Sequence, residues 1–185
     1  MWTDADAVFV TLNVPGSNND TLPWTNGFEN QPAHNNEVAA RNAANGRWLT
    51  AAFNLAHRSH AKALVLAIQA DMFDLANLPP NGDGLDAYTP FVQQLANLTV
   101  AFGKPVLLLN GDSHLYGADH PLADPSSPTG QLHNTQAVPN LTRITVQGST
   151  NAPAEWLKLT IDSHTPGVFS SVNVPYCQNP LVSCP

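Results

Sequence analysis

Two continuous apolar runs constrain the fold of this chain more than any other feature of its sequence. They are KALVLAIQADMF at residues 62–73 and KPVLLLN at residues 104–110. Such runs are typical of strands that are buried on both faces of a parallel sheet. The segment between them, LDAYTPFVQQLANLTVAF at residues 85–102, has helical spacing, with Pro90 near its first turn. The order of strand, helix and strand therefore indicates a parallel α/β unit.

The segments before these runs extend the same pattern. AVFVTLNV, residues 7–14, alternates apolar and polar side chains and predicts a strand. EVAARNAANGRWLTAAFNLAH, residues 37–57, predicts a helix, although Gly46 weakens it by about 1 kcal/mol relative to alanine. We therefore expect an α/β fold with a mixed sheet and flanking helices, and ligand chemistry at the carboxyl ends of its strands. Four polar side chains fall at these ends: Gln69, Asp71, Asp112 and His114.

The last third of the chain has a different character. A long polar loop is expected at residues 118–140. Short alternating stretches follow it, and they predict closing antiparallel strands. The stretches are LTRITVQ at 141–147, EWLKLTID at 155–162 and GVFSSVNV at 167–174. We expect residues 1–176 to form a single domain.

Both cysteines lie in a Pro-rich tail at residues 177–185. We predict a Cys177–Cys184 disulfide, because a pair near a chain end gains from a covalent staple and the spacing is too sparse for a zinc knuckle. Disulfides persist in oxidising compartments, so the prediction favours an extracellular or periplasmic location.

The charge balance excludes two classes of partner. The 185 residues include 7 Lys or Arg and 14 Asp or Glu, which gives a net charge of −7. We expect no nucleic-acid-binding surface, because such a surface needs basic side chains that neutralise phosphates. No apolar run approaches the roughly 20 residues that cross a bilayer, so no membrane interaction is expected. A phosphate-ester substrate stays open, since a bound metal ion can supply the positive charge.

The turn NGDSH after the second apolar run is the main candidate site. Asp112 and His114 are two residues apart, so both side chains can point into one cavity and share a divalent cation. The alternative is structural, with Asp112 capping the turn through an Asx hydrogen bond and His114 packing at the strand end. Gln69, at the end of the neighbouring strand, is either a weak carbonyl ligand or an amide that bonds to loop backbone.

Other polar motifs have simpler explanations. A second Asp-Ser-His at residues 162–164 either completes a metal site with the first or forms a polar turn before Pro166. PGSNND at residues 15–20 either cradles a phosphate or is a plain strand-exit turn. The remaining histidines are expected to be ordinary surface residues: His34, His57, His60, His120 and His133.

Taken together, the order of segments resembles the C-terminal half of a calcineurin-like metallophosphoesterase, over roughly residues 7–175. The segments that carry the resemblance are VFVTLNVPGSNND, RWLTAAFNLA, ALVLAIQAD and VLLLNGDSHLYG, followed by NLTRITVQG and GVFSSVNV. The resemblance implies half of a four-layer α/β/β/α sandwich. It also implies a divalent metal cofactor (Mn, Fe, Zn or Ca), because the family uses two metals to direct a hydroxide at phosphorus.

The resemblance also assigns roles to individual residues. The family's late metal ligands are a His at one strand end and a Gly-His-x-His turn at the next. These positions are Gln69 and the turn Gly111-Asp112-Ser113-His114, in which His114 is kept and Asp112 is a substitute ligand. The family's early motifs, an Asp-x-His, a Gly-Asp and a Gly-Asn-His, have no counterpart in this sequence.

Two functions follow from these expectations. The first is a metal-dependent hydrolase of phosphate monoesters or diesters, part of a longer protein or not, with Asp112 and His114 as catalytic residues and Gln69 as a further metal ligand. The second is a non-catalytic remnant that serves as a binding or interaction module. A weaker third idea is a one-metal protein that joins the two Asp-Ser-His turns. A bare half-sandwich would expose one apolar sheet face, so we also expect a homo-oligomer or a partner chain that covers it.

Overall fold

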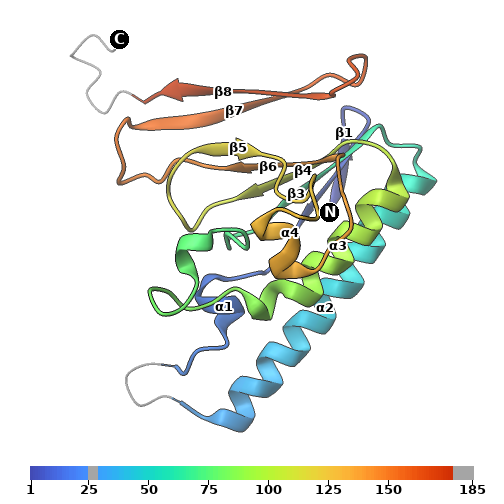
Figure 1. Cartoon of the computed structure of the whole chain (residues 1–185). Helices are drawn as coiled ribbons and strands as arrows, with labels where there is room; N and C mark the ends of the chain where they lie inside the picture. The colour runs from blue at the N-terminus through green and yellow to red at the C-terminus, as the bar shows by residue number, and fades with distance from the viewer. Residues whose placement is uncertain (25–28, 177–185) are drawn as a thin grey trace.

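The computed structural model describes residues 1–24 and 29–176. These residues form an α/β protein with a six-stranded mixed sheet, flanking helices and a separate two-stranded hairpin (Figure 1). The predicted α/β class, with a mixed sheet and flanking helices, is confirmed. The predicted disulfide between Cys177 and Cys184 lies outside the described residues.

The sheet has the strand order β1-β2-β3-β4-β6-β5. Its strands are β1 (Trp2–Asp4), β2 (Ala7–Thr11), β3 (Ala63–Ala67), β4 (Val106–Asn110), β5 (Gly117–Asp119) and β6 (Leu141–Thr145). The four central strands β2, β3, β4 and β6 are parallel, and the edge strands β1 and β5 are antiparallel to their neighbours. The predicted antiparallel pairing of the strand after the polar loop holds for β6 with β5, but β6 pairs parallel with β4. Alternation fixes which side of a strand is apolar, but not the direction in which the strand pairs.

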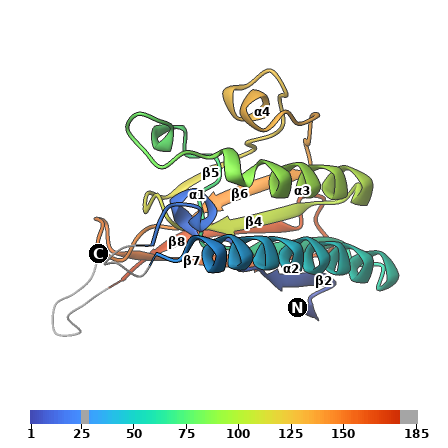
Figure 2. The ribbon, with the colours of Figure 1, turned by 90° about the horizontal axis from the view of Figure 1, so that it is seen from below.

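The helices pack on one face of this sheet (Figures 1 and 2). They are α1 (Gly16–Asp20), α2 (Gln31–Arg58), α3 (Thr89–Phe102) and α4 (Pro128–His133), with 3₁₀ turns η1 (Leu75–Asn77) and η2 (Asp86–Tyr88). The side chain of Asn30 caps α2 by accepting from the Ala33 N–H at 3.3 Å. Gly103 ends α3 in the left-handed conformation, with φ 67°, that such C-terminal positions favour. The main core lies between these helices and the sheet, and includes Leu49, Phe53, Leu64, Leu66 and Leu95.

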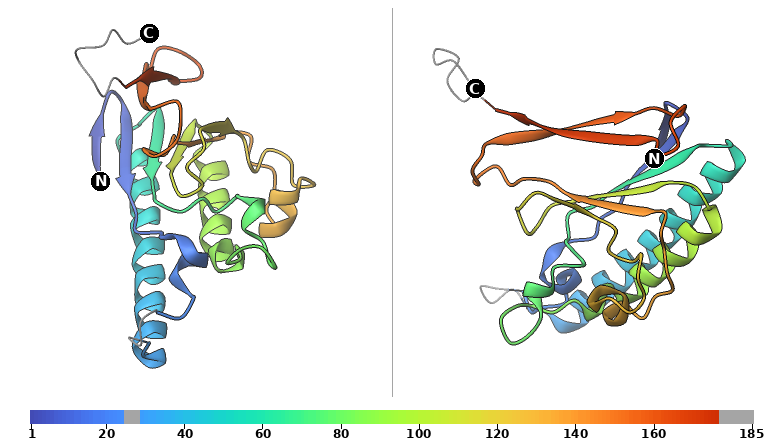
Figure 3. Two further views of the ribbon diagram at one scale, coloured as in Figure 1. Left: turned by 90° about the vertical axis from the view of Figure 1, so that its left-hand side faces the viewer. Right: turned by 45° about the horizontal axis from the view of Figure 1, so that its top comes forward.

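A hairpin packs on the opposite face of the sheet. It consists of β7 (Glu155–Ile161) and β8 (Phe169–Pro175), which pair antiparallel as predicted (Figure 3). Its apolar side chains Leu157, Leu159 and Ile161 pack with Val65, Leu107 and Ile144 of the sheet. The apolar face that we expected to be exposed is therefore covered by the chain's own hairpin. Association with a second chain stays a prediction.

Two of the histidines that we expected on the surface are buried. His34 is 1% exposed and His133 is 0% exposed. The polar loop that contains His133 folds back as α4, so the imidazole reaches the interior and contacts Phe73 edge-on. Composition predicts a polar loop, but whether one of its side chains is buried depends on tertiary contacts. In the part of the chain that the structure describes, no helix is long and apolar enough to cross a membrane.

Candidate functional site

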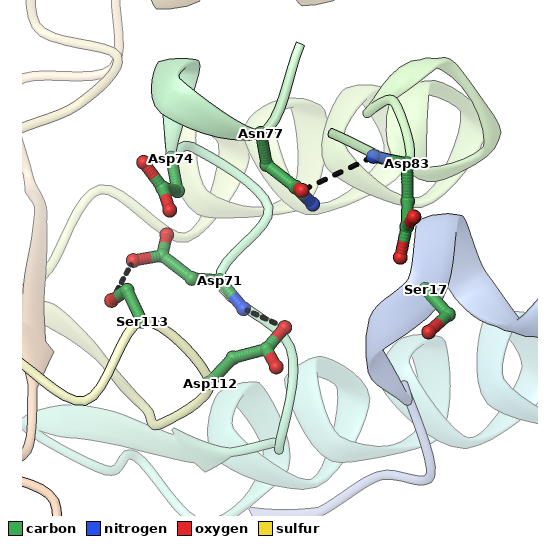
Figure 4. Close-up of a pocket in the computed structure, with 7 residues that line it drawn as sticks. All are labelled: Ser17, Asp71, Asp74, Asn77, Asp83, Asp112 and Ser113. Atoms are coloured by element: carbon green, nitrogen blue, oxygen red, sulfur yellow. Dashed lines mark hydrogen bonds between the residues drawn. The ribbon is translucent and has the colours of Figure 1, made fainter. Parts of the chain in front are cut away.

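A pocket of about 180 Å³ opens at the carboxyl edge of the parallel strands. We call it the acidic pocket; its lining residues are Ser17, Asp71, Asp74, Asn77, Asp83, Asp112 and Ser113 (Figure 4). They come from the segments that follow β2, β3 and β4. Parallel strands end at one edge, so the loops after them meet there. The sequence predicted ligand-binding residues at the carboxyl ends of the strands, and the pocket lies at this edge.

Asp112 lies in the wall of the acidic pocket with its backbone in the left-handed region, at φ 71°. One carboxylate oxygen accepts from Gln69 Nε2 at 2.8 Å, and the other accepts from the Asp71 N–H at 3.3 Å. The carboxylate lies against Gly16, where a Cβ would approach Asp112 Oδ1 to 2.9 Å. A larger residue at Gly16 would therefore displace this carboxylate. The predicted pair of Gln69 and Asp112 is brought together, but Gln69 presents its N–H₂ group to the carboxylate.

Asp71 forms the back of the acidic pocket and is only 6% exposed. Its carboxylate accepts from Ser113 Oγ at 2.8 Å and from Arg143 Nη1 at 2.5 Å. The Arg143 guanidinium continues to Asp119, to which it donates at 2.8 and 2.6 Å. Burial opposes the charged form of Arg143, but the hydrogen bonds and charges of Asp119 and Asp71 outweigh it and raise its pKa. The charge of Asp71 is thus balanced within the fold.

The loop after β2 brings Ser17 to the pocket through an unusual backbone. Ser17, Asn18, Asn19 and Asp20 all have positive φ, between 50° and 62°. This conformation costs an L-residue roughly 1–2 kcal/mol, less for Asn and Asp, and persists only where the surroundings fix it. Arg41 supplies that fixation, because it donates to Asn19 Oδ1 at 2.6 Å and to the Asn19 carbonyl at 3.0 Å. Strained residues of this kind cluster at functional sites.

Tyr88 anchors the start of the same loop. Its hydroxyl donates to the Pro15 carbonyl at 2.9 Å, and the side chain is 1% exposed. Burial raises the pKa of Tyr88 to about 12. The phenol therefore remains a hydrogen-bond donor at neutral pH and holds the loop in place.

His114 does not line the acidic pocket. Its backbone is tightly fixed at φ 64°, since its carbonyl accepts from the Gly148 N–H at 2.9 Å and from Asn151 Nδ2 at 2.6 Å. A Cβ on Gly148 would approach His114 Cβ to 2.7 Å, so only glycine permits this turn. The imidazole is exposed on the turn that follows the pocket wall. Asp112 and His114 are thus neighbours in one turn, but their side chains do not converge in the pocket.

The second Asp-Ser-His is a separate polar turn. Asp162 accepts from the His164 N–H at 2.9 Å and from its Nδ1 at 3.1 Å. The backbone hydrogen bond from His164 lowers the pKa of Asp162. This turn connects β7 to β8 on the far side of the sheet and does not complete the acidic pocket.

The described residues do not by themselves fit a metal centre of three or more protein ligands. In residues 1–24 and 29–176, no group of three or more His, Cys, Asp or Glu side chains is placed to hold a metal ion. Asp112 is the candidate ligand that points into the acidic pocket, whereas Gln69 donates to it and His114 lies outside. A metal in this pocket would need ligands in addition to those predicted.

Four residues of the site could not be identified from the sequence. Asp74, Asn77 and Asp83 line the acidic pocket from a segment that carries only turn signals. Arg143 comes from β6, where a single basic residue in an alternating strand gives no indication of its partner. The Asp-Gly at residues 83–84 marks a turn, but only the folded loop shows where its carboxylate points.

Comparison with known proteins yields no relatives. No family model, no curated protein and no solved structure matches this chain. The resemblance to calcineurin-like metallophosphoesterases therefore rests on the sequence segments quoted above.

Proposed function

We propose that this chain acts as a metal-dependent phosphoester hydrolase that resembles the calcineurin-like metallophosphoesterases, with the acidic pocket as its site. The observation that carries the proposal is that four carboxylates line one pocket at the carboxyl edge of the sheet, those of Asp71, Asp74, Asp83 and Asp112, although no three of them are placed to hold a metal ion together. Among the described residues only Asp71 of the four has a cationic partner. The other three leave an excess of negative charge that a divalent cation would neutralise.

This charge excess also bears on the substrate. A phosphate ester is an anion, so an acidic pocket repels it unless a cation lies between them. The cation, when bound, would supply the positive charge for the phosphate oxygens. The described residues supply too few ligands for a metal ion held by three or more side chains, so the proposal requires further ligands.

Two residues of this chain have distinct roles in the proposal. Asp112 would hold the cation, since its carboxylate is already fixed at the pocket by Gln69 and by the backbone of Asp71. The proposal gives proton exchange with the leaving group to His114, which is exposed on the turn that follows the pocket wall.

A second candidate is a non-catalytic binding or interaction module. It is favoured by the internal hydrogen bonds of Asp112, both of whose oxygens already have donors. In that case Asp112 is a structural residue that joins two loops. Replacement of Asp112 would then lower the stability of the fold and would affect no catalytic activity.

Hydrolysis of bis(para-nitrophenyl) phosphate in the presence of Mn²⁺ separates these candidates. The proposal predicts Mn²⁺-stimulated hydrolysis that falls at least about a hundredfold in Asp112→Asn and in His114→Ala. Asp162→Asn and His164→Ala, in the other Asp-Ser-His turn, are matched controls that should keep full activity. If Mn²⁺ does not stimulate hydrolysis, or if neither Asp112→Asn nor His114→Ala lowers it, only the binding module remains.

A further inference from the structure

A second pocket lies away from the acidic pocket, beside the long helix α2. Its volume is about 530 Å³, and it lies between residues 11–13, at the end of β2, and one face of α2 at residues 44–51. We call it the Trp48 groove. Small-molecule sites in proteins have volumes of about 300–1,000 Å³ and combine an apolar lining with a few polar groups. Figure 2 shows α2 alongside the edge of the sheet that carries β2.

The apolar side of the Trp48 groove comes from one stripe of α2. Ala44 and Ala51 lie about one turn before and after Trp48, so the three side chains share a face of the helix. Trp48 is 45% exposed, although an indole normally buries most of its surface. The small alanines on either side leave the indole face accessible to a ligand.

The opposite wall of the groove is fixed before any ligand arrives. Leu12 is 8% exposed and its N–H donates to the Ala67 carbonyl at 3.1 Å, which ties this segment to the sheet. Asn45 Nδ2 donates to the Asn13 carbonyl at 2.7 Å and ties the same segment to α2. A groove that needs no ordering on binding loses less free energy when a ligand enters.

Arg47 gives the groove its charge. It lies next to Trp48 in the lining, is exposed, and makes no ion pair with any described residue. By contrast, Arg41 and Arg143 are both paired with carboxylates. In a chain of net charge −7, an unpaired guanidinium beside an apolar surface is complementary to an apolar anion.

We propose that the Trp48 groove binds a small apolar carboxylic acid. The hydrocarbon body lies on the indole of Trp48 between Ala44 and Ala51, and the carboxylate pairs with Arg47. The apolar contact provides affinity and the guanidinium selects the acid over neutral molecules of the same length. This site does not depend on the acidic pocket or on its proposed activity.

Titration of the whole chain with sodium octanoate, followed by calorimetry, tests the proposal. We expect saturable binding to one site, and at least about tenfold weaker binding in Trp48→Ala and in Arg47→Gln. Ala44→Leu should abolish binding, because the larger side chain fills the groove. The fold should be kept, because leucine is a good helix former and position 44 is exposed on α2. Arg58→Gln, at the end of the same helix, is the matched control and should bind like the original chain.

Octanamide, a neutral molecule of the same length, tests the role of charge. It should bind to the original chain at least about tenfold more weakly than octanoate does. To Arg47→Gln, octanamide and octanoate should bind with equal affinity. Absence of saturable octanoate binding, equal affinity for octanamide, or unchanged binding in Ala44→Leu and Trp48→Ala would overturn the proposal. Sedimentation that shows a dimer dissociated by Ala44→Leu would also overturn it, because a second copy would then cover the groove.

Discussion

Asp71 and Arg143 form a buried ion pair behind the acidic pocket, and its value to the fold depends on both partners being present. Their side chains are 6% and 15% exposed. Removal of Asp71 leaves Arg143 with the partly exposed Asp119 as its remaining carboxylate partner, and removal of Arg143 leaves the Asp71 charge buried without a cation. The acidic pocket is thus built on a charge pair that sequence reasoning did not detect, since Asp71 and Arg143 are far apart in the chain.

Replacement of Asp71 by Asn should therefore lower the free energy of unfolding by about 1.5–3 kcal/mol, because a charged hydrogen bond to Arg143 is lost while Asp119 remains. Asp119→Asn is the matched control, because Asp119 also bonds to Arg143 but is 45% exposed. Its effect should stay within about 1 kcal/mol. Urea denaturation measures both values, and equal losses in the two variants would show that Asp71 has no special structural role.

His133 links α4 to the loop that carries Asp71. Its Nδ1 and the Thr89 hydroxyl are 3.0 Å apart, and its Nε2 lies 2.9 Å from the Met72 carbonyl. The carbonyl only accepts, so Nε2 carries the proton and Nδ1 accepts from Thr89 in the neutral ring. Burial lowers the pKa of His133, and the Met72 carbonyl only partly opposes this effect.

The lowered pKa predicts a stability that depends on pH. Below the unfolded value of about 6.5, the unfolded chain binds a proton that the folded chain resists, so this contribution is lost as pH falls. His133→Gln should therefore cost more stability at pH 8 than at pH 5, by urea denaturation. His164→Gln, at a 93% exposed side chain, is the control and should cost less than about 1 kcal/mol at either pH. A cost for His133→Gln that is the same at both pH values would contradict the assignment.

At the scale of elements, the sequence predicted which segments form strands better than how they pair. The continuous apolar runs predicted β3 and β4 correctly as strands, because strands that are buried on both faces are apolar throughout and do not alternate. The stretch EWLKLTID alternates, and it does form β7. However, alternation did not show that β7 and β8 form a layer of their own while β6 joins the parallel sheet. That choice depends on long-range packing.

The hairpin offers a direct test of this layer. Leu159 faces the sheet, where it packs with Val65, Leu107 and Ile144, whereas the next residue, Thr160, is exposed. Leu159→Ser should lower the free energy of unfolding by about 1–3 kcal/mol, because apolar contact with the sheet is lost. Thr160→Ser should stay within about 0.5 kcal/mol. Equal effects in the two variants would mean that the hairpin does not cover the sheet in solution.

At the scale of the whole molecule, the position of the candidate site was predictable and its composition was not. Parallel strands place their carboxyl ends at one edge, so Asp112 was expected there from the NGDSH turn alone. Asp74, Asp83 and Arg143 arrive from distant loops and strands, and no local pattern links them. The net charge of −7 indicated an acidic protein, but only the fold gathers four of its carboxylates in one pocket.

Binding of Mn²⁺ to the metal-free chain, measured by calorimetry, tests the central claim most directly. If the acidic pocket holds a divalent cation through Asp112, the chain should bind one Mn²⁺, and Asp112→Asn should weaken binding at least about tenfold. Asp162→Asn should bind as the original chain does. No saturable Mn²⁺ binding, or equal binding in Asp112→Asn, would contradict the claim that this pocket is a metal-dependent site.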